Sequence, residues 1–188
     1  MHKYLWIVVI ALLWTAGSAM AQSPSLGYSP FLQRGTHELA LSGTFDFQNE
    51  GDALLDLTGR YGVFLRDNLE VGGFAELSGD FDDFFRYGIG GFAELHIPRW
   101  AFLKGQAVPY LGADLGLEFV DVDPSVGSDN AALLFRLRPG LKWFIRDYFA
   151  IDTSFFFTIA TDDLFPNEAH GLDPYDIGLR LGLRIYFK

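Results

Sequence analysis

The sequence predicts an all-β protein, an eight-stranded antiparallel up-and-down transmembrane β-barrel. Three observations carry this prediction: apolar and polar residues alternate with a period of two along eight segments, these segments are about 10–13 residues long, and the chain starts with an export signal. Strands of soluble proteins usually have about 5–6 residues, whereas a tilted strand needs about 9–11 residues to cross a bilayer. Length and export together therefore favour a membrane barrel over a soluble β-sandwich.

The start of the chain has the pattern of a secretory signal peptide. Lys3 supplies a positive charge, residues 5–14 are almost entirely apolar, and Ala19 and Ala21 are the small residues that precede a cleavage site. The apolar run is too short to cross a bilayer comfortably, which argues against a permanent membrane anchor. We therefore expect cleavage between Ala21 and Gln22.

Cleavage at this bond divides the chain into a signal peptide (1–21), an N-terminal periplasmic segment (22–34) and the barrel (35–188). The chain contains no Cys, so an exported fold must be held by packing and hydrogen bonds rather than by disulfides. The formal net charge of −10 argues against nucleic acid as a partner, because binding phosphates requires a basic face.

Each of the eight alternating segments has one apolar face and one polar face. Their approximate ranges, in chain order, are 37–47, 53–64, 69–78, 85–97, 108–120, 132–144, 148–158 and 175–187. In the first four, the apolar face begins with Leu39 and Leu41, Leu55 and Leu57, Leu69 and Val71, and Tyr87 and Ile89. In the last four, it begins with Leu111 and Ala113, Leu133 and Phe135, Phe149 and Ile151, and Ile177 and Leu179. In a membrane barrel these faces contact lipid, and the polar faces fill the lumen.

The polar faces mix charges of both signs. Their acidic residues are Glu38, Asp46, Asp56, Glu70, Glu76, Glu94, Asp114, Glu118, Asp152 and Asp176, and their basic residues are Arg60, Arg86, Arg136, Arg138, Lys142, Arg180 and Arg184. Eight strands enclose only enough space for side chains, and an unpaired buried charge is costly. We therefore predict a connected lumen charge network, formed by Arg60, Arg86, Arg136, Arg138, Arg180 and Arg184 with Glu70, Glu76, Glu94, Asp114, Glu118 and Asp152.

The connections between the segments alternate between tight turns and longer stretches. Two near copies, "FLRDNLEV" and "FIRDYFAI", predict tight turns at Phe64–Val71 and Phe144–Ile151, and Pro98–Ala107 is the third connection on the same side. The opposite side has connections rich in Asp, Gly, Asn and Pro, at Asn49–Asp52, Gly79–Phe84, Asp121–Asn130 and Thr161–Pro174. Short periplasmic turns and longer extracellular loops are typical of bacterial membrane barrels.

Aromatic residues gather near both ends of the predicted strands. One set is Phe64, Trp100, Phe102, Trp143, Tyr148, Phe149 and Phe187. The other set is Phe45, Phe47, Phe81, Phe84, Phe85, Phe119, Phe155 and Phe157. We expect them to form two girdles at the two lipid interfaces.

The hexapeptide "GGFAEL" occurs twice, at Gly72–Leu77 and at Gly90–Leu95. The two copies fall in neighbouring predicted strands, which form the arms of one hairpin. In each copy we expect Phe and Glu to point inward and Ala and Leu to point to lipid. The glycines then leave room for the inward aromatic ring in a narrow lumen.

The C-terminal stretch "RLGLRIYF" resembles the β-signal of bacterial outer-membrane proteins, which the barrel assembly machinery recognises. The matching positions are Arg180, Gly182, Ile185 and Phe187, and Lys188 after the final aromatic departs from the pattern. Together with the signal peptide, the eight strands and the turn pattern, it makes the chain resemble the small eight-stranded barrel family of outer membrane protein X and the transmembrane domain of outer membrane protein A.

This resemblance implies a monomer in the outer membrane of a Gram-negative bacterium, with extracellular loops and periplasmic termini. It implies outer-membrane lipids and lipopolysaccharide as surroundings, and the barrel assembly machinery and periplasmic chaperones as partners in biogenesis. It implies no cofactor. The function expected from it is structural or surface-interacting, in membrane integrity or adhesion. A lipid A-modifying enzyme and a narrow low-conductance pore are the alternatives.

An enzyme of this kind would need a nucleophile beside a His and an acid. Glu94 and His96 share the predicted inner face of one strand, but no Ser is placed to join them, while His37 is expected to point outward and His170 lies in a loop beside Glu168. We therefore expect no catalytic activity. The loop "DVDPSVGSDN" suggests loose divalent-cation binding by Asp121, Asp123 and Asp129, although it lacks the closing Glu of an EF-hand and a solvated loop is the simpler interpretation.

Overall fold

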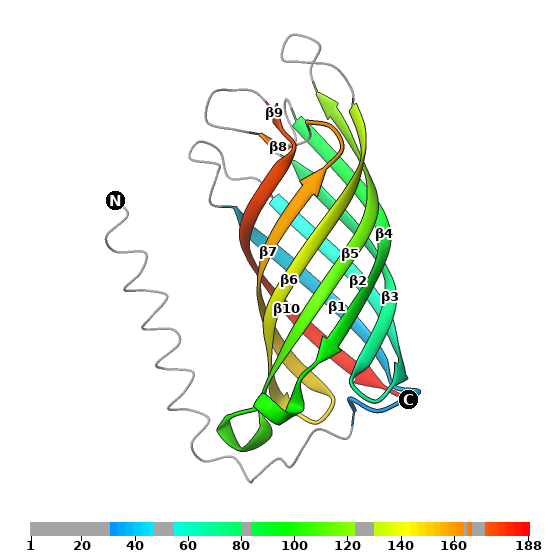
Figure 1. Cartoon of the computed structure of the whole chain (residues 1–188), viewed down its shortest axis with the longest axis vertical. Helices are drawn as coiled ribbons and strands as arrows, with labels where there is room; N and C mark the ends of the chain where they lie inside the picture. Colours follow the sequence, from blue (N-terminus) through cyan, green and yellow to red (C-terminus); the bar gives the residue numbers. More distant parts are fainter. Residues whose placement is uncertain (1–30, 47–54, 80–83, 123–129, 164, 167–171) are drawn as a thin grey trace, which may run out of the picture.

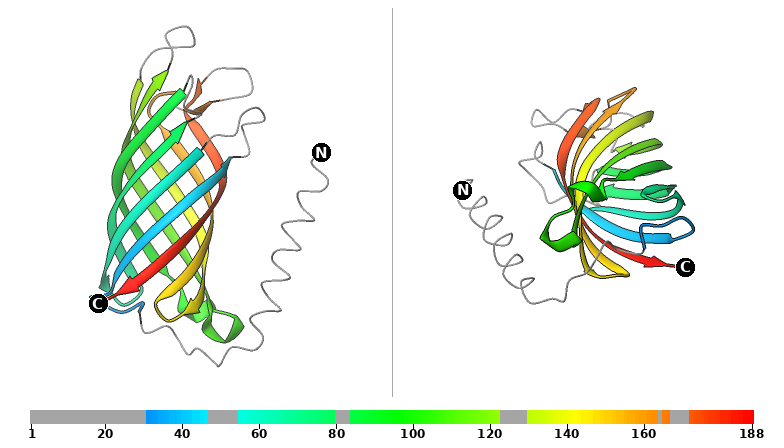
Figure 2. Two further views of the ribbon diagram at one scale, coloured as in Figure 1. Left: turned by 180° about the vertical axis from the view of Figure 1, so that it is seen from behind. Right: turned by 60° about the horizontal axis from the view of Figure 1, so that its bottom comes forward.

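The computed structural model describes residues 31–46, 55–79, 84–122, 130–163, 165–166 and 172–188. Eight antiparallel strands form one closed barrel, in which each strand pairs with its neighbour in the chain and β10 returns to pair with β1 (Figures 1 and 2). The barrel strands are β1 (His37–Asp46), β2 (Leu55–Arg66), β3 (Leu69–Gly79), β4 (Phe84–His96), β5 (Ala107–Val122), β6 (Asn130–Arg146), β7 (Phe149–Ala160) and β10 (Tyr175–Phe187). The predicted fold class is confirmed.

Short elements complete the two ends of the barrel. The 3-10 helices η2 (Pro98–Trp100) and η3 (Leu103–Gly105), the β2–β3 and β6–β7 turns and the C-terminus lie at the lower end in Figure 1. The small hairpin of β8 (Phe165–Pro166) and β9 (Leu172–Asp173) lies at the upper end. Within the described part of the chain, no helix is long and apolar enough to cross a membrane.

Several predicted features lie outside the described residues. They are the signal peptide 1–21 with its cleavage bond at Ala21 and Gln22, the first part of the predicted periplasmic segment 22–34, and Asp123 and Asp129 of the candidate calcium loop. These features remain predictions.

The two tight turns with near-identical sequences have the same backbone irregularity. The pairing register shifts between Phe64 and Arg66 in the β2–β3 hairpin and between Phe144 and Arg146 in the β6–β7 hairpin. An extra residue in one strand of an antiparallel pair produces such a bulge and sharpens the local twist. The shared "F-x-R-D" sequence therefore gives two similar bulged turns at one end of the barrel.

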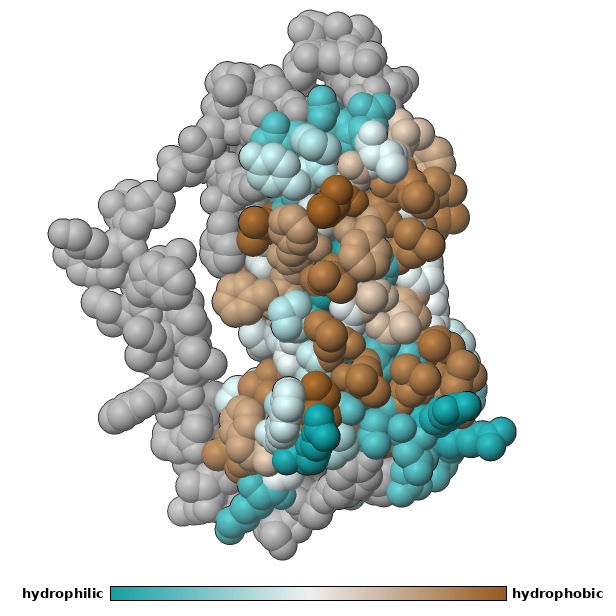
Figure 3. Space-filling view, in the orientation of Figure 1, coloured by the Kyte–Doolittle hydropathy of each residue, from teal (hydrophilic) through white to brown (hydrophobic). Residues whose placement is uncertain are grey.

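The barrel exposes apolar residues and buries charged ones. Ile89 and Leu115 have 62% and 57% of their surface exposed, whereas Arg138 and Lys142 are fully buried. Figure 3 shows the exposed apolar side chains as a belt across the face in view, with hydrophilic residues above and below it. Soluble proteins have the opposite distribution, and a barrel whose outer surface faces lipid has this one.

An apolar cluster closes the lower end of the lumen. Leu32, in the segment that precedes β1, is fully buried against Phe64, Phe144 and Tyr186. Two backbone hydrogen bonds hold this segment to the β2–β3 turn, from Asn68 N–H to the Leu32 carbonyl (2.9 Å) and from Gly35 N–H to the Phe64 carbonyl (2.9 Å). We refer to Leu32 and its cluster as the lower seal.

The lower seal corrects one sequence-based expectation. Phe64 was expected in an interfacial girdle, but its side chain is 1% exposed and points into the lumen. The reason is strand parity: Arg60 and Phe64 are four residues apart on β2 and therefore share the inner face. Proximity to a strand end was a poorer guide than the two-residue period.

A second apolar cluster closes the upper end. Phe165, from β8, is 1% exposed and packs against Val120, Ala132 and Ala160. The Arg86 guanidinium lies 4.9 Å from the centre of the Phe165 ring. We refer to this cluster as the upper seal. A cluster of buried apolar side chains thus lies near each end of the polar interior.

The two "GGFAEL" copies form a reciprocal contact across the β3–β4 hairpin. Phe74 pairs in register with Gly90, and Phe92 pairs with Gly72. A Cβ atom on Gly90 would lie 2.6 Å from Phe74 Cε1, and one on Gly72 would lie 2.7 Å from Phe92 Cε1. Each ring therefore occupies the space that the other copy's first glycine leaves open, which explains why one hairpin carries the motif in both arms.

Replacement of Gly90 by Ala should destabilise the barrel, because the added Cβ would also lie 2.4 Å from the Leu115 carbonyl oxygen. We expect Gly90→Ala to lower the free energy of unfolding by about 1–3 kcal/mol. Gly91→Ala is the matched control: its Cβ would lie 3.6 Å from the Gly72 oxygen on the outer face, so a change within about 0.5 kcal/mol is expected. Urea unfolding in detergent micelles measures both, and equal stabilities would contradict the steric explanation.

Candidate functional site

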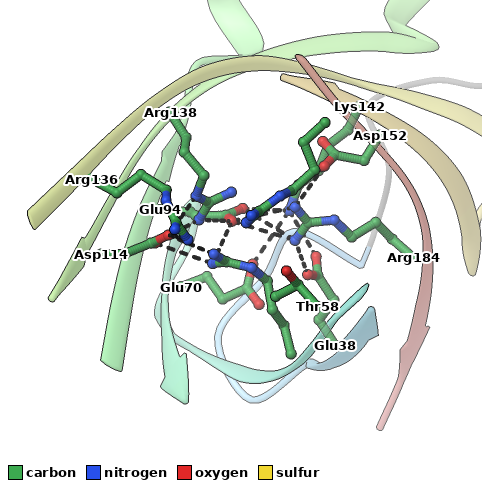
Figure 4. A network of polar contacts seen from close by, with 12 residues as sticks. Glu38, Thr58, Glu70, Glu94, Asp114, Arg136, Arg138, Lys142, Asp152 and Arg184 are labelled. Carbon is green, nitrogen blue, oxygen red and sulfur yellow. Dashed lines mark hydrogen bonds and ion pairs between the residues drawn. The ribbon is translucent and has the colours of Figure 1, made fainter. Parts of the chain in front are cut away.

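The lumen contains the largest concentration of chemically active side chains in the described residues. Because alternate residues of a strand point to opposite faces, each of the eight barrel strands contributes at least one inward charge. The buried acids are Glu38, Glu70, Glu76, Glu94, Asp114, Glu118, Asp152 and Asp176. The buried bases are Arg60, Arg86, Arg136, Arg138, Lys142, Arg180 and Arg184. Figure 4 shows the central part of this set.

Glu94 is the centre of the lower half of the network. Its carboxylate lies 2.8 Å from Arg138 Nη2, 2.8 Å from Lys142 Nζ and 3.4 Å from Arg184 Nη1. Arg60 Nη1 lies further away, at 3.9 Å. A single carboxylate therefore holds cationic groups from β2, β6 and β10 together inside the barrel.

Asp114 joins the lower and middle parts of the network. Arg60 donates to both of its oxygens, at 3.2 and 2.5 Å, and Arg138 donates to it through Nε and Nη2, both at 2.9 Å. Two-pronged Arg–carboxylate contacts are stronger and more directional than single ones. Asp114 on β5 thus fixes the orientation of both guanidinium groups.

The upper half of the network is centred on Arg136. This residue donates to both oxygens of Glu76, at 2.8 and 3.0 Å, and to the Thr158 hydroxyl at 2.8 Å. Glu118 lies 3.4 Å from Arg136 and 3.8 Å from Arg86. The ion pairs therefore continue without a break toward the upper seal.

Three members of the network are absent from the predicted set: Glu38, Lys142 and Asp56, whose Oδ2 lies 3.5 Å from Arg86 Nη2. Lys142 Nζ lies 2.7 Å from Glu38 and 3.4 Å from Glu70, and Arg184 contacts both Glu38 and Asp152. Lys142 and Glu38 are both on predicted inner faces, so strand parity alone was sufficient to include them. Their pairing across the barrel, from β6 to β1, required the closed structure.

Aromatic rings support the guanidinium groups from the sides. The Arg60 guanidinium lies 5.2 Å from the centre of the Phe74 ring and 4.9 Å from that of Phe92, the two rings of the repeated motif. Arg136 and Arg180 lie 5.6 and 5.4 Å from Phe156. Guanidinium groups stack favourably on aromatic faces when they are removed from water. The inward phenylalanines therefore separate and position the charges as well as filling space.

Glu70, Glu94 and His96 have ligand atoms within 4.8 Å of one another, a spacing that could hold a metal ion. His96 Nε2 lies 4.0 Å from Glu94 Oε2. Lys142, however, contacts both carboxylates, and Glu94 is also paired with Arg138. A cation at this point would face strong repulsion from these ammonium and guanidinium groups. The arrangement is therefore better suited to charge pairing than to metal binding.

The two histidines in the described part of the chain, His37 and His96, do not form an arrangement suited to nucleophilic catalysis. His96 is buried, its ring lies 5.2 Å from that of Phe64, and its Nδ1 lies 3.3 Å from the Asn68 carbonyl oxygen. His37 lies on the outer face, 2.8 Å from the Tyr61 hydroxyl. Among the described contacts of these two rings, none involves a Ser or Thr hydroxyl. Glu168 and His170 lie beyond the described residues.

The predicted assembly signal is divided between the two faces of β10. Arg180 and Gly182 are buried in the lumen, while Ile185 and Phe187 are exposed on the outer surface. The Phe187 ring stacks on that of His37 across the β1–β10 junction, with centres 5.6 Å apart. In the folded barrel these residues therefore also help to fill the lumen and to close it.

Comparison with known structures finds proteins of the same architecture. The N-terminal β-barrel domain of OprF from Pseudomonas aeruginosa is 17% identical, with a TM-score of 0.61 over 82% of this chain and 98% of that domain. Neisserial surface protein A is 18% identical, with a TM-score of 0.54 over 81% of this chain and 96% of that protein. The chain thus has the fold of the small eight-stranded outer-membrane barrels, as the sequence predicted. No protein-family model and no curated protein sequence matches it.

The network geometry predicts unequal roles for two buried glutamates. Replacement of Glu94 by Gln should lower the free energy of unfolding by about 3 kcal/mol, because it leaves several buried cations without their shared counter-charge. Glu118→Gln removes a carboxylate that is equally buried but makes longer ion pairs, and should cost less than half as much. Urea unfolding of both variants in the same detergent tests which substitution lowers the free energy of unfolding more. A larger decrease for Glu118→Gln than for Glu94→Gln would contradict the prediction.

Proposed function

We propose that the protein is a structural and surface-interacting barrel of the Gram-negative outer membrane, with a lumen that is closed to transport. The observation that carries this proposal is the combination of an apolar outer belt with an interior that contains many ion pairs and has a buried apolar cluster near each end. Such a molecule presents chemistry to its surroundings only through its lipid-facing surface and its two rims. Membrane integrity and adhesion are the roles that this arrangement favours.

The described interior gives little support to the alternative of a narrow pore. An ion crossing the barrel would have to displace Leu32 at the lower seal, break the Glu94 and Asp114 ion pairs, and displace Phe165 at the upper seal. Conducting pores need sites that an ion can both enter and leave. Paired charges at 2.8–2.9 Å already satisfy one another and leave an ion little to gain.

The geometry also favours a non-enzymatic role over lipid A modification. The Glu94–His96 pair lies inside the lumen, whereas lipid would contact the opposite face of β4. A lipid substrate would have to pass the strand wall or a seal to reach this pair. The structure thus supports our expectation that the protein catalyses no reaction on lipids.

The orientation and the partners belong to the same proposal. We assign the lower end, which holds the short turns and the C-terminus, to the periplasm, and the upper end to the cell surface. Residues 1–21 would be removed as a signal peptide, residues 22–34 would precede the barrel in the periplasm, and Arg180, Gly182, Ile185 and Phe187 would be recognised by the assembly machinery. Lipopolysaccharide would surround the upper half of the belt, and the barrel would act as a monomer without a cofactor.

Planar-bilayer recording tests the closed lumen directly. We expect the purified full-length protein to insert without producing regular conductance steps, because both seals and the ion pairs between them block the interior. Regular steps that grow with salt concentration would support the pore instead. A barrel that fails to insert into bilayers would contradict the membrane assignment itself.

Mass spectrometry of lipid A separates the proposed role from the enzymatic alternative. Lipid A from cells with and without the protein should have identical acyl chains and headgroups. A difference that disappears in the His96→Ala variant would assign catalysis to the buried pair and overturn the structural role. Western blotting of outer-membrane fractions provides the control for equal amounts of both proteins.

A further inference from the structure

The described residues at the lower end of the barrel are mainly basic, although the chain as a whole is acidic. In the sequence, the stretches that follow β1, β3, β5 and β7, residues 47–54, 80–83, 123–129 and 161–174, contain acidic residues and no Lys or Arg. The described lower end has the opposite character. Its exposed basic residues are Arg34, Arg66, Arg99, Lys104, Arg146 and Lys188, against the acidic side chains of Asp67 and Asp147. A chain with a formal net charge of −10 thus has a locally basic rim.

Three of these basic residues are interleaved with aromatic residues, of which Trp100 and Phe102 are exposed and Trp143 is half-buried. We define the rim patch as Arg99, Trp100, Phe102, Lys104, Trp143 and Arg146. Trp100 and Phe102 have 60% and 46% of their surface exposed. The Arg99 guanidinium lies 5.2 Å from the centre of the Trp100 ring. Green 3-10 segments at the bottom of Figure 1 mark the position of the patch.

The rim patch is held in place by contacts that the residues on either side of η3 make with β5 and β6. The rings of Phe102 and Trp143 meet edge-on with centres 5.9 Å apart. Phe102 also forms an isolated antiparallel bridge with Ala107, and the Phe144 N–H donates to the Gln106 carbonyl at 2.7 Å. The segment between β4 and β5 is therefore fixed against the end of β6, close to Arg146.

The backbone of this segment is strained at two successive residues. Leu103 and Lys104 have φ values of 50° and 59°, in the left-handed region that residues with a Cβ atom rarely adopt. Both side chains are exposed. Such strain persists only where the surrounding structure enforces it. Here it presents an apolar and a basic side chain side by side at the border of the outer belt.

We propose that the rim patch binds the phosphate of an anionic phospholipid, such as phosphatidylglycerol, in the leaflet that faces the periplasm. Tryptophan rings favour the depth of the lipid headgroups, and basic side chains near the surface attract anionic headgroups. Arg99, Lys104 and Arg146 supply the positive charge, while Trp100, Phe102 and Trp143 contact the upper part of the acyl chains. This inference rests on the proposed function, because it requires the lower end to lie at the periplasmic surface of a membrane.

Electron paramagnetic resonance with spin-labelled lipids tests the proposal. The full-length protein is reconstituted into phosphatidylcholine vesicles, and the association constants of spin-labelled phosphatidylglycerol and phosphatidylcholine at the protein surface are compared. We expect a preference of about fivefold for phosphatidylglycerol, the effect of roughly one effective basic contact. The variant Arg99→Gln/Lys104→Gln/Arg146→Gln should reduce the ratio to about one.

Two further variants make the test specific. Arg34→Gln/Arg66→Gln/Lys188→Gln changes the net charge of the same rim equally but leaves the rim patch intact, and it should retain most of the preference. Arg99→Lys/Lys104→Arg/Arg146→Lys conserves the charge and should retain the preference as well. Equal losses in the two glutamine variants would overturn the assignment to the patch, because they would reveal only a diffuse attraction to the rim.

The outcomes for the lipid site and for the membrane location are distinguishable. Inserted protein with a ratio of one would overturn the lipid site and leave the proposed function intact. Failure to insert into vesicles would overturn both. If the wild type, but not the rim-patch variant, co-sediments with purified peptidoglycan and shows a lipid ratio of one, the patch belongs to a cell-wall polymer and the lipid proposal is wrong.

Discussion

Charge neutralisation in a narrow space is the constraint on which the rest of this structure depends. An eight-stranded barrel has room inside for side chains only, so each inward charge must find its partner among side chains of other strands. Glu94 and Asp114 meet this requirement by holding Arg60 and Arg138 between them. The resulting cross-barrel contacts join strands that are not neighbours in the sheet. The network therefore connects opposite sides of the barrel wall through the lumen. The rims and the outer belt are then the surfaces on which the barrel can contact other molecules.

The sequence was sufficient for the fold and for the direction of most side chains, because strand parity is a local property. The two-residue period of the strands places Arg138 and Glu94 in the interior. The same period places Phe64 in the lumen, and not in the aromatic girdle at the lipid interface. Pairing was not predictable in the same way: the contact between Lys142 and Glu38 depends on the register and closure of the whole barrel. The sequence alone could have placed both residues in the lumen network, but it could not have shown that they form an ion pair with each other.

The seals were missed for a different physical reason. Leu32 and Phe165 belong to segments outside the long strands, where no two-residue period exists to indicate which way a side chain points. Their burial depends on where the chain returns to the mouth of the barrel. Irregular segments of this kind carry much of what distinguishes one barrel from another, while the strands give the architecture shared with OprF and neisserial surface protein A.

The lower seal has a consequence for the order of assembly. Leu32 packs against Phe64 from β2, Phe144 from β6 and Tyr186 from β10, so its binding site is made from the beginning, the middle and the end of the barrel. This site exists only after β10 has met β1. The segment that carries Leu32 is synthesised before every strand, yet it takes its final place after the last one. Its docking therefore marks the completion of the barrel.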